Sequence, residues 1–167
     1  MSSEILIVFL LSYILGSVPF GLILTKTFLK KDIRTIGSKN IGATNVLRTG
    51  NKLFAILTLF LDILKGSAAV LITDVFFPNL VFLSGLAAIL GHIFPVWLKF
   101  RGGKGVATYL GILLVLSIKL GLIFCLSWAL IAFITKYSSL SSIISSIIIF
   151  IISFLENNFE LNSYLFI

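Results

Sequence analysis

The chain alternates between long apolar runs and short polar segments, and this alternation predicts its elements. Six apolar runs are long enough, or nearly long enough, to cross a bilayer: Ile5–Leu24, Leu53–Phe77, Leu80–Leu98, Val106–Ile118, Leu120–Ile134 and Leu140–Leu155. About 20 apolar residues in a helix span the hydrocarbon core. We expect all six runs to be helices, because backbone groups in lipid must be hydrogen-bonded within their own segment.

The fourth and fifth runs are short, and two arrangements fit them. They could form two separate helices or one long, tilted helix. Lys119 and Gly121 lie near their junction and favour a turn there.

Composition places the whole chain in the membrane. Hydrophobic residues make up 59% of it and charged residues 11%, and the mean hydropathy is +1.17, whereas soluble domains carry about 25% charged residues. The amino terminus has Glu4 where a cleavable signal would carry positive charge. We expect an all-α integral membrane protein, a polytopic helical bundle in which residues 1–167 form a single domain with six membrane spans and the start of a seventh.

Basic residues are concentrated in three of the predicted loops. The first loop carries most of them against one acid, Asp32: Lys26, Lys30, Lys31, Arg34, Lys39, Arg48 and Lys52. The second carries Lys99, Arg101 and Lys104, and the third Lys136. Basic loops stay in the cytoplasm, so these three loops are expected inside and the amino terminus outside.

The first polar segment, "DIRTIGSKNIGATNVLRTG" (residues 32–50), follows "GSVPFGLILTK" (residues 16–26). It interleaves hydroxyl and amide side chains with glycines and is flanked by cations: Ser38, Asn40, Thr44, Asn45, Gly37, Gly42, Arg34, Lys39 and Arg48. Such a mixture offers donors and close backbone approach to an anionic ligand. The alternative is a turn followed by a capped helix start, since Ser, Thr and Asn are good caps.

The second polar segment, "GHIFPVWLKFRGGKGVAT" (residues 91–108), contains a glycine-rich loop. Gly102, Gly103 and Gly105 are expected to let successive N–H groups converge on one oxygen cluster. A helix from Val106 would direct further N–H groups to the same place, and Lys104 adds a charge. The GxxxxGK[ST] spacing of a nucleotide-binding P-loop is missing. A glycine-rich turn between spans is the alternative.

Catalytic and metal-binding candidates are few. His92 is the single histidine, and one cysteine, Cys125, lies in an apolar run. We therefore expect neither a metal site nor a cofactor, and His92 is either a helix-end residue or a base. Asp62 and Lys65 are three residues apart in "LDILKG" and share a helix face, as a structural ion pair or as part of the site.

Four motifs, in this order and at these separations, resemble one family. "GSVPFG", "GSKNIGATNVLRTG", "LDILKG" and "GHIFPVWLKFRGGKGVAT" are similar to the bacterial acyl-phosphate:glycerol-3-phosphate acyltransferases, the PlsY family, and "KYSSL" resembles its next cytoplasmic turn. The resemblance covers most of the chain.

The resemblance implies a seven-helix enzyme of the bacterial inner membrane. It implies acyl transfer from acyl phosphate to the 1-hydroxyl of glycerol 3-phosphate, which gives lysophosphatidic acid and phosphate for phospholipid synthesis. The implied partners are these two substrates, membrane lipid and the enzyme that makes acyl phosphate at the membrane surface, with no nucleic acid and no cofactor.

The family's motif positions also imply roles for particular residues. The implied catalytic residues are Ser38, Arg48, Asn45 and His92. The implied substrate-binding residues are Asn40, Thr44, Lys104, Gly102, Gly103 and Gly105.

The sequence departs from the family pattern in two places. Lys39 stands where the family more often has glycine. The family's third motif follows a seventh helix, whereas this chain ends in "FLENNFELNSYLFI", in which "SYLFI" would begin that helix. We therefore expect a chain that lacks the carboxy-terminal part of the family's domain. The alternatives are an inactive, truncated relative and a transporter of a phosphorylated metabolite.

Overall fold

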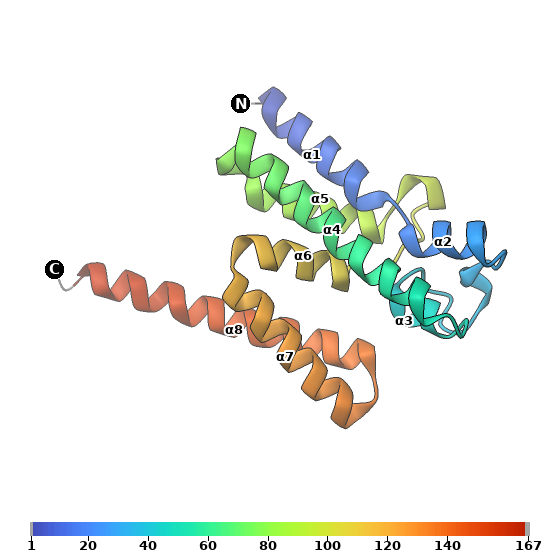
Figure 1. Ribbon diagram of the computed structural model, residues 1–167. Coiled ribbons are helices and arrows are strands. Elements are labelled where there is room, and N and C mark those ends of the chain that lie inside the picture. The colour runs from blue at the N-terminus through green and yellow to red at the C-terminus, as the bar shows by residue number, and fades with distance from the viewer. Residues whose placement is uncertain (1, 166–167) are drawn as a thin grey trace. The chain divides into compact units, whose positions relative to one another are not determined.

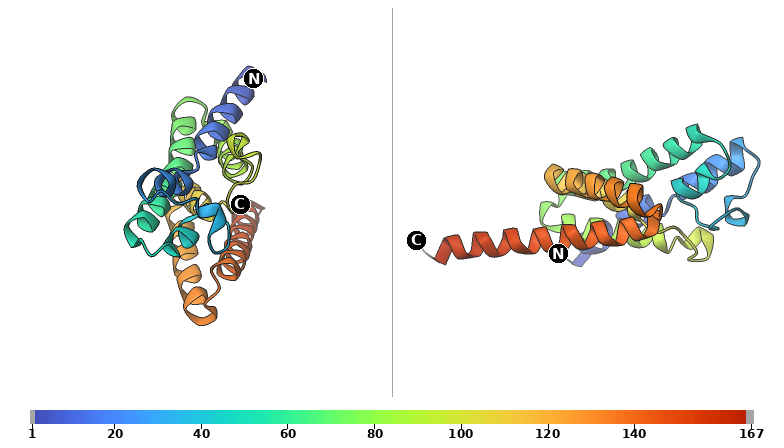
Figure 2. Two further views of the ribbon diagram at one scale, coloured as in Figure 1. Left: turned by 90° about the vertical axis from the view of Figure 1, so that its right-hand side faces the viewer. Right: turned by 90° about the horizontal axis from the view of Figure 1, so that it is seen from below.

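The structure, a computed structural model, describes the backbone of residues 2–165 and the side chains of residues 3–156. Regular structure in these residues is entirely helical (Figures 1 and 2). The helices are α1 (Ser2–Ser17), α2 (Phe20–Phe28), α3 (Ala43–Leu47), α4 (Lys52–Phe76), α5 (Val81–Ile93), α6 (Val106–Leu116), α7 (Ile118–Thr135) and α8 (Ser138–Leu165), with 3-10 turns η1 (Ile33–Thr35), η2 (Pro78–Leu80) and η3 (Val96–Leu98). Two compact units form, one up to Leu116 and one from Ser117.

The first predicted span is broken rather than continuous. α1 ends at Ser17 and α2 begins at Phe20, because Pro19 cannot donate a backbone hydrogen bond. Side chains from other elements satisfy the carbonyls at the break: Lys65 Nζ donates to Val18 O at 2.8 Å, and Trp97 Nε1 donates to Ser17 O at 3.0 Å. The break between α1 and α2 is therefore stabilised by side-chain hydrogen bonds from other elements of the first unit.

α4 is the central helix of the first unit and packs against α1, α2, α3, α5 and α6. Its contact with α6 is close enough to need glycine on both helices. A Cβ atom on Gly66 would lie 3.0 Å from the Thr108 carbonyl carbon, and one on Gly111 would lie 2.9 Å from that of Ile63. Small residues at such contacts are typical of helices that pack in membranes.

The third predicted span ends earlier as an α-helix than expected. α5 stops at Ile93, and the chain continues through Pro95 into η3. Pro95 has no backbone N–H to donate to a helical hydrogen bond, so the helix that was predicted to reach Leu98 is interrupted there. Leu98 then packs against a buried cluster under the first polar segment: Leu22, Ile33, Ile41, Val46 and Ala55.

The fourth and fifth runs form two helices, as the turn hypothesis predicted. The break lies at Ser117, whose hydroxyl caps α7 by accepting from Leu120 N at 3.3 Å. Lys119 and Gly121 therefore lie inside α7 rather than in the turn.

The second unit is a pair of helices, α7 and α8, joined at Lys136 and Tyr137. Trp128 Nε1 donates to Ser142 Oγ at 3.0 Å, and Lys119 pairs with Glu156 at 2.5 Å. α8 continues as one helix to Leu165, so the loop expected between Leu155 and a seventh helix is absent from the described backbone. No proline or glycine occurs in residues 156–165 to end it.

Five helical segments of the described residues are long and apolar enough to cross a membrane: Ser3–Phe28, Lys52–Phe76, Pro78–Leu98, Ile118–Thr135 and Ser138–Glu156. α6 is apolar but shorter. Large apolar side chains lie on the outside of these segments, with Val75 74% and Phe82 76% exposed. Extensive exposed apolar surface of this kind marks a lipid-facing protein.

Candidate active site

Asn45 is the centre of the first polar segment. Its side chain is buried on α3, and Nδ2 donates to the carbonyls of Ile33, Ile36 and Asn40 at 3.0, 3.0 and 2.8 Å. Its Oδ1 accepts from Ser38 N at 3.0 Å. One side chain therefore holds the backbone of residues 33–40 in place, and the donors of its NH₂ group are fully used in doing so.

Gly37 brings Arg48 and Ser38 together. Its φ of +51° favours glycine. A Cβ atom there would lie 2.6 Å from Arg48 Cδ and 2.9 Å from Arg48 Nη1. The Arg48 guanidinium thus lies over Gly37, which directly precedes the exposed Ser38 in the chain. A cation and a hydroxyl placed side by side in this way can bind a phosphate.

The other predicted residues of this segment lie nearby. Asn40 Oδ1 accepts from Gly42 N at 3.0 Å and shapes the entry to α3. Thr44 lies exposed on α3, one residue before Asn45. The first polar segment therefore contains both a helix start, as the alternative interpretation held, and a cationic surface.

Asp32, the one acid of this loop, is already neutralised. Arg34 Nη2 donates to its carboxylate at 2.7 Å, and Lys26 Nζ lies at 3.3 Å. Hydrogen bonds from Arg34, joined by that from Lys26, hold the pKa of Asp32 well below its usual range. This interaction contributes stability above the ordinary carboxyl pKa and loses it as the pH falls, so it is intact near neutral pH.

The glycine-rich loop does not form the expected nest of free N–H groups at its first two glycines. Gly102 N donates to Ile93 O and Gly103 N donates to His92 O, both at 3.0 Å. These carbonyls at the end of α5 lack helical partners, and the loop satisfies them. The predicted convergence of the Gly102 and Gly103 N–H groups on a ligand is therefore wrong.

At the end of the loop, Lys104 is exposed and Gly105 is buried. Gly105 has a φ of +75°, which favours glycine, and it directly precedes α6. The exposed cation Lys104, at the entry to α6, is thus the part of the loop end that a ligand can reach.

His92 is buried at the end of α5, between the loop and α6. Its Nδ1 lies 3.1 Å from Thr108 Oγ1 and 3.8 Å from Asp62 Oδ1. On its other side, the ring nitrogen Nε2 meets Gly103, where a Cβ atom would overlap it. Asp62 also pairs with Lys65 at 2.8 Å, so the ion pair expected from "LDILKG" forms and borders His92.

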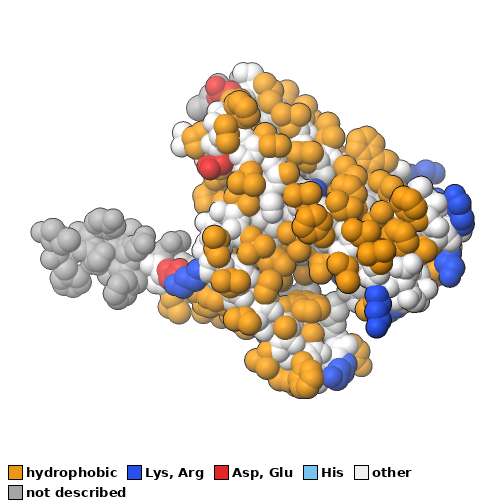
Figure 3. Space-filling view, in the orientation of Figure 1, with side chains coloured by type: hydrophobic (Ala, Val, Ile, Leu, Met, Phe, Trp, Pro, Cys, Tyr) orange, Lys and Arg blue, Asp and Glu red, His pale blue; other side chains and the backbone are white. Residues whose placement is uncertain are grey.

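Both polar segments lie at the same end of the first unit, as both ribbon views show (Figures 1 and 2). Leu98 of the second segment packs against the cluster that contains Ile33, Ile41 and Val46 of the first. Lys and Arg side chains gather at this end, whereas apolar side chains cover the helices (Figure 3). The structure therefore gathers the predicted site residues at one cationic end of the bundle.

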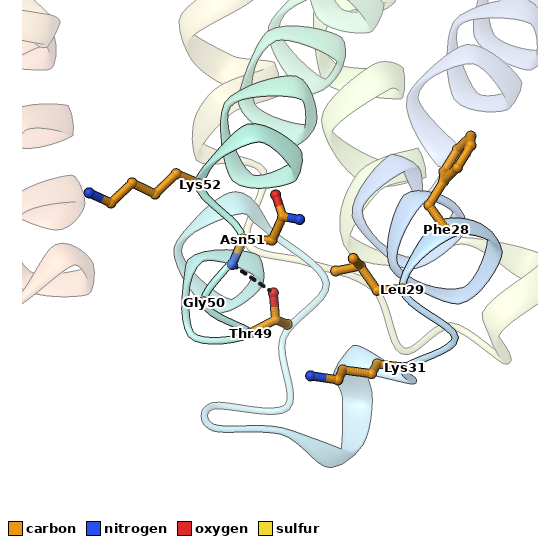
Figure 4. A pocket seen from close by; sticks show the side chains of 7 residues that line it. All are labelled: Phe28, Leu29, Lys31, Thr49, Gly50, Asn51 and Lys52. Carbon is orange, nitrogen blue, oxygen red and sulfur yellow. Dashed lines mark hydrogen bonds between the residues drawn. The ribbon is translucent and has the colours of Figure 1, made fainter.

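A shallow, open hollow lies beside the first polar segment (Figure 4). It is lined by Phe28, Leu29, Lys31, Thr49, Gly50, Asn51 and Lys52. It contains two cations but none of the predicted catalytic or substrate-binding residues. Among the described residues, no group of three or more His, Cys, Asp and Glu side chains is placed to hold a metal.

Gly37 was named in the first polar segment for close backbone approach to a ligand, and the structure instead places the Arg48 side chain against it. Thr108, which contacts His92, was not selected from the sequence. Thr108 looked like an ordinary helix residue, since its partner is 16 residues away.

Comparison with known proteins gives one family throughout. The family profile described as glycerol-3-phosphate acyltransferase matches residues 6–167. Glycerol-3-phosphate acyltransferase of Pelagibacter ubique is 62% identical over 141 residues, covering 84% of this chain and 74% of that protein. The enzyme of Mesorhizobium japonicum is 54% identical over 143 residues, covering 86% and 73%.

Solved structures agree with the sequence relatives. The crystal structure of PlsY (YgiH), an integral membrane glycerol 3-phosphate acyltransferase, in its glycerol 3-phosphate form superposes with a TM-score of 0.84 at 40% identity, over 91% of this chain and 77% of that one. Its lysophosphatidic acid form gives 0.82 at 39% identity, over 91% and 76%. The resemblance inferred from the four motifs is confirmed, and so is the integral membrane class. The chain belongs to the glycerol-3-phosphate acyltransferase family.

Proposed function

We propose that this protein transfers a fatty acyl group from acyl phosphate to the 1-hydroxyl of glycerol 3-phosphate, giving lysophosphatidic acid and phosphate. Membership of an acyltransferase family supports the reaction. The observation that carries the site is that the Arg48 side chain lies over Gly37, the residue before Ser38, in a loop whose backbone the Asn45 hydrogen bonds hold in place. This arrangement suits a phosphate-bearing substrate.

Each predicted residue has a place in this reaction. Arg48 and Ser38 bind phosphate and stabilise the charge that develops on oxygen. Asn45 acts through the loop, because its amide is occupied by backbone partners. Asn40 and Thr44 complete the first polar segment, and the Gly102–Gly105 loop with Lys104 receives the second substrate.

The reaction needs little activation by the protein. Acyl phosphate is a mixed anhydride with phosphate as a good leaving group. The glycerol 3-phosphate hydroxyl oxygen attacks the acyl carbon, the bond from that carbon to the phosphate oxygen breaks, and the hydroxyl proton passes to a phosphate oxygen or to His92. No acyl-enzyme forms, and the protein contributes positioning and electrostatic stabilisation.

The membrane arrangement follows from charge and helix length. The chain crosses the bacterial inner membrane six times, as one domain, with its amino terminus outside. α6 is the short crossing: its 11 residues rise about 16 Å, against about 30 Å of hydrocarbon. The glycine-rich loop before it therefore lies below the membrane surface, close to a lipid-borne acyl phosphate. An enzyme that supplies acyl phosphate would dock at this cytoplasmic face.

Substitution of the paired phosphate-binding residues tests the proposal. Ser38→Ala and Arg48→Ala should each lower kcat about 10²–10³-fold, the usual effect of removing one electrostatic donor. The assay follows ester formation from palmitoyl phosphate and glycerol 3-phosphate by protein purified in detergent. Arg34→Ala is the matched control, because Arg34 is an exposed loop arginine that pairs with Asp32. Near-normal rates in both site variants would remove the first polar segment from catalysis.

A further inference from the structure

Lys39, in the first polar segment, has a backbone angle that is unusual for lysine. Its φ is +59°, in the left-handed region that favours glycine. Among the described residues, the other lysines with positive φ are Lys30, Lys99 and Lys136, and they follow the ends of α2, η3 and α7, where left-handed residues are common. Lys39 ends no helix, so helix termination does not account for its conformation.

Hydrogen bonds fix the backbone at Lys39 and on both sides of it. Lys39 N donates to Ile36 O at 2.9 Å. Asn45 fixes the two neighbours, because its side chain accepts from Ser38 N at 3.0 Å and donates to Asn40 O at 2.8 Å. The loop therefore holds an L-residue in a region that disfavours it, although glycine would fit there without strain. Such an unusual residue inside a candidate site points to a function for its side chain.

The charge of Lys39 is not neutralised within this segment. Asp32 is the one acid of the loop, and Arg34 at 2.7 Å and Lys26 at 3.3 Å already hold its carboxylate. In the part of the chain that the structure describes, neither Lys39 nor Arg48 pairs with a carboxylate. Two uncompensated cations therefore belong to the first polar segment.

Ser38 is the residue that brings these two cations to one ligand. It follows Gly37, against which the Arg48 side chain packs, and it directly precedes Lys39. All three of Ser38, Lys39 and Arg48 are exposed. Consecutive Cα atoms are about 3.8 Å apart, and a charge acts over about 10 Å at 0.1 M salt. A phosphate at the Ser38 hydroxyl is therefore within range of the Lys39 ammonium.

We propose that Lys39 is a further phosphate-binding residue for the acyl transfer: its ammonium, next to Ser38, strengthens binding of the substrate whose phosphate lies at Ser38 and Arg48. The inference rests on the proposed function and adds a residue to its site. Glycerol 3-phosphate and acyl phosphate both carry such a phosphate, and their separate KM values distinguish them. The charge attracts the phosphate in the bound substrate and in the transition state alike, so it acts on KM rather than on kcat.

Replacement of Lys39 by glycine tests this role in the purified enzyme. Lys39→Gly removes the charge and suits the φ of +59°, so the loop keeps its shape. At low salt we expect KM for at least one of the two substrates to rise about three- to tenfold, with kcat almost unchanged. The rise should shrink at high salt, because salt screens the charge. Lys39→Arg, which keeps the charge, should keep the original KM.

The matched control is Lys30→Gly. Lys30 is also an exposed lysine of the basic loop with a positive φ, +54°, but it follows the end of α2. Its KM values should stay near those of the unaltered protein. Unchanged KM values in Lys39→Gly, an equal rise in Lys30→Gly, or a rise that salt does not reduce would overturn the role of Lys39 and leave the proposed function intact. Absence of ester formation by the unaltered protein would overturn the proposed function and this inference with it.

Discussion

Gly103 shows how a single missing side chain shapes this site. The His92 ring occupies the space that a Cβ atom on residue 103 would fill, and the backbone of the same glycine satisfies the His92 carbonyl. Glycine is required there by lack of space rather than by an unusual backbone angle.

We expect Gly103→Ala to lower kcat as well as substrate affinity, because the methyl group displaces the His92 ring from its contact with Thr108. The loss should be about as large as that of His92→Ala, measured with the same purified enzyme. Gly85→Ala is the control. Gly85 lies on α5, and a Cβ atom there would meet only the side chain of Ile112, with Cγ2 at 3.1 Å. A change in KM alone in Gly103→Ala would mean that the ring does not move.

Asn45 gives a second prediction, about stability. Asn45→Asp keeps an acceptor for Ser38 N but turns a negative oxygen toward three carbonyls that lose their donor. Each unsatisfied buried group costs about 1–3 kcal/mol, so the melting temperature should fall clearly. Asn51→Asp is the matched control, since Asn51 only accepts from Phe54 N at the start of α4 and aspartate caps equally well. Equal melting temperatures for the two variants would contradict the role of Asn45.

The sequence indicated which residues lie at this site, but not which of them face a ligand and which hold the backbone in place. Ser38, Arg48 and His92 could be named from residue type and motif. Two features depend on contacts between residues that no local pattern specifies. The Asn45 amide donates to backbone carbonyls, and the Gly102 and Gly103 N–H groups donate to the carbonyls at the end of α5. The contact between Thr108 and His92 is of the same kind.

At the scale of elements, the helix breaks carry polar groups deep into the bundle. Trp97 supplies a donor to the Ser17 carbonyl, and Lys65 adds a second donor to the Val18 carbonyl, which also accepts from Phe20 N at 3.1 Å. Lys65 also neutralises Asp62, so one ammonium serves both a helix break and a buried carboxylate.

We expect Lys65→Met to destabilise the protein by about 3–5 kcal/mol, because it leaves a buried carboxylate without its partner. The double variant Asp62→Asn/Lys65→Met should recover part of that loss, since no charge is left unpaired. Chemical or thermal unfolding in a defined detergent measures both. If the double variant is no more stable than Lys65→Met, the ion pair is not what Lys65 contributes.

Apolar runs predicted the helices well, because lipid forces apolar backbone into helices regardless of tertiary context. The breaks at Pro19 and Pro95 interrupt runs that hydropathy alone joins. The boundary at Ser117 arises from a cap, whereas the nearby Lys119 and Gly121 only suggested a turn. The continuation of α8 to Leu165 follows from the lack of a helix breaker, which polar composition after Leu155 concealed.

At the scale of the whole molecule, the charge distribution predicts its orientation. Thr35 lies in the basic loop and Asn79 in the turn after α4, at opposite ends of α4, and both are exposed. In a Cys125→Ser background, Asn79→Cys should react with a membrane-impermeant maleimide added to intact cells with permeabilised outer membranes. Thr35→Cys should react only after the inner membrane is opened. The reverse labelling pattern would contradict the proposed topology.

The lysine that reaches the first helix break also bears on how the chain enters the membrane. A charged residue at the centre of an inserting segment is penalised by about 2.5–3.5 kcal/mol, and α4 contains two such residues side by side. Asp62 and Lys65 pair with each other within α4. The Val18 carbonyl that also accepts from Lys65 belongs to the preceding span, which is synthesised first. We therefore expect the first two spans to insert together, because the Val18 carbonyl of the earlier span can then hydrogen-bond the Lys65 ammonium as α4 enters the lipid.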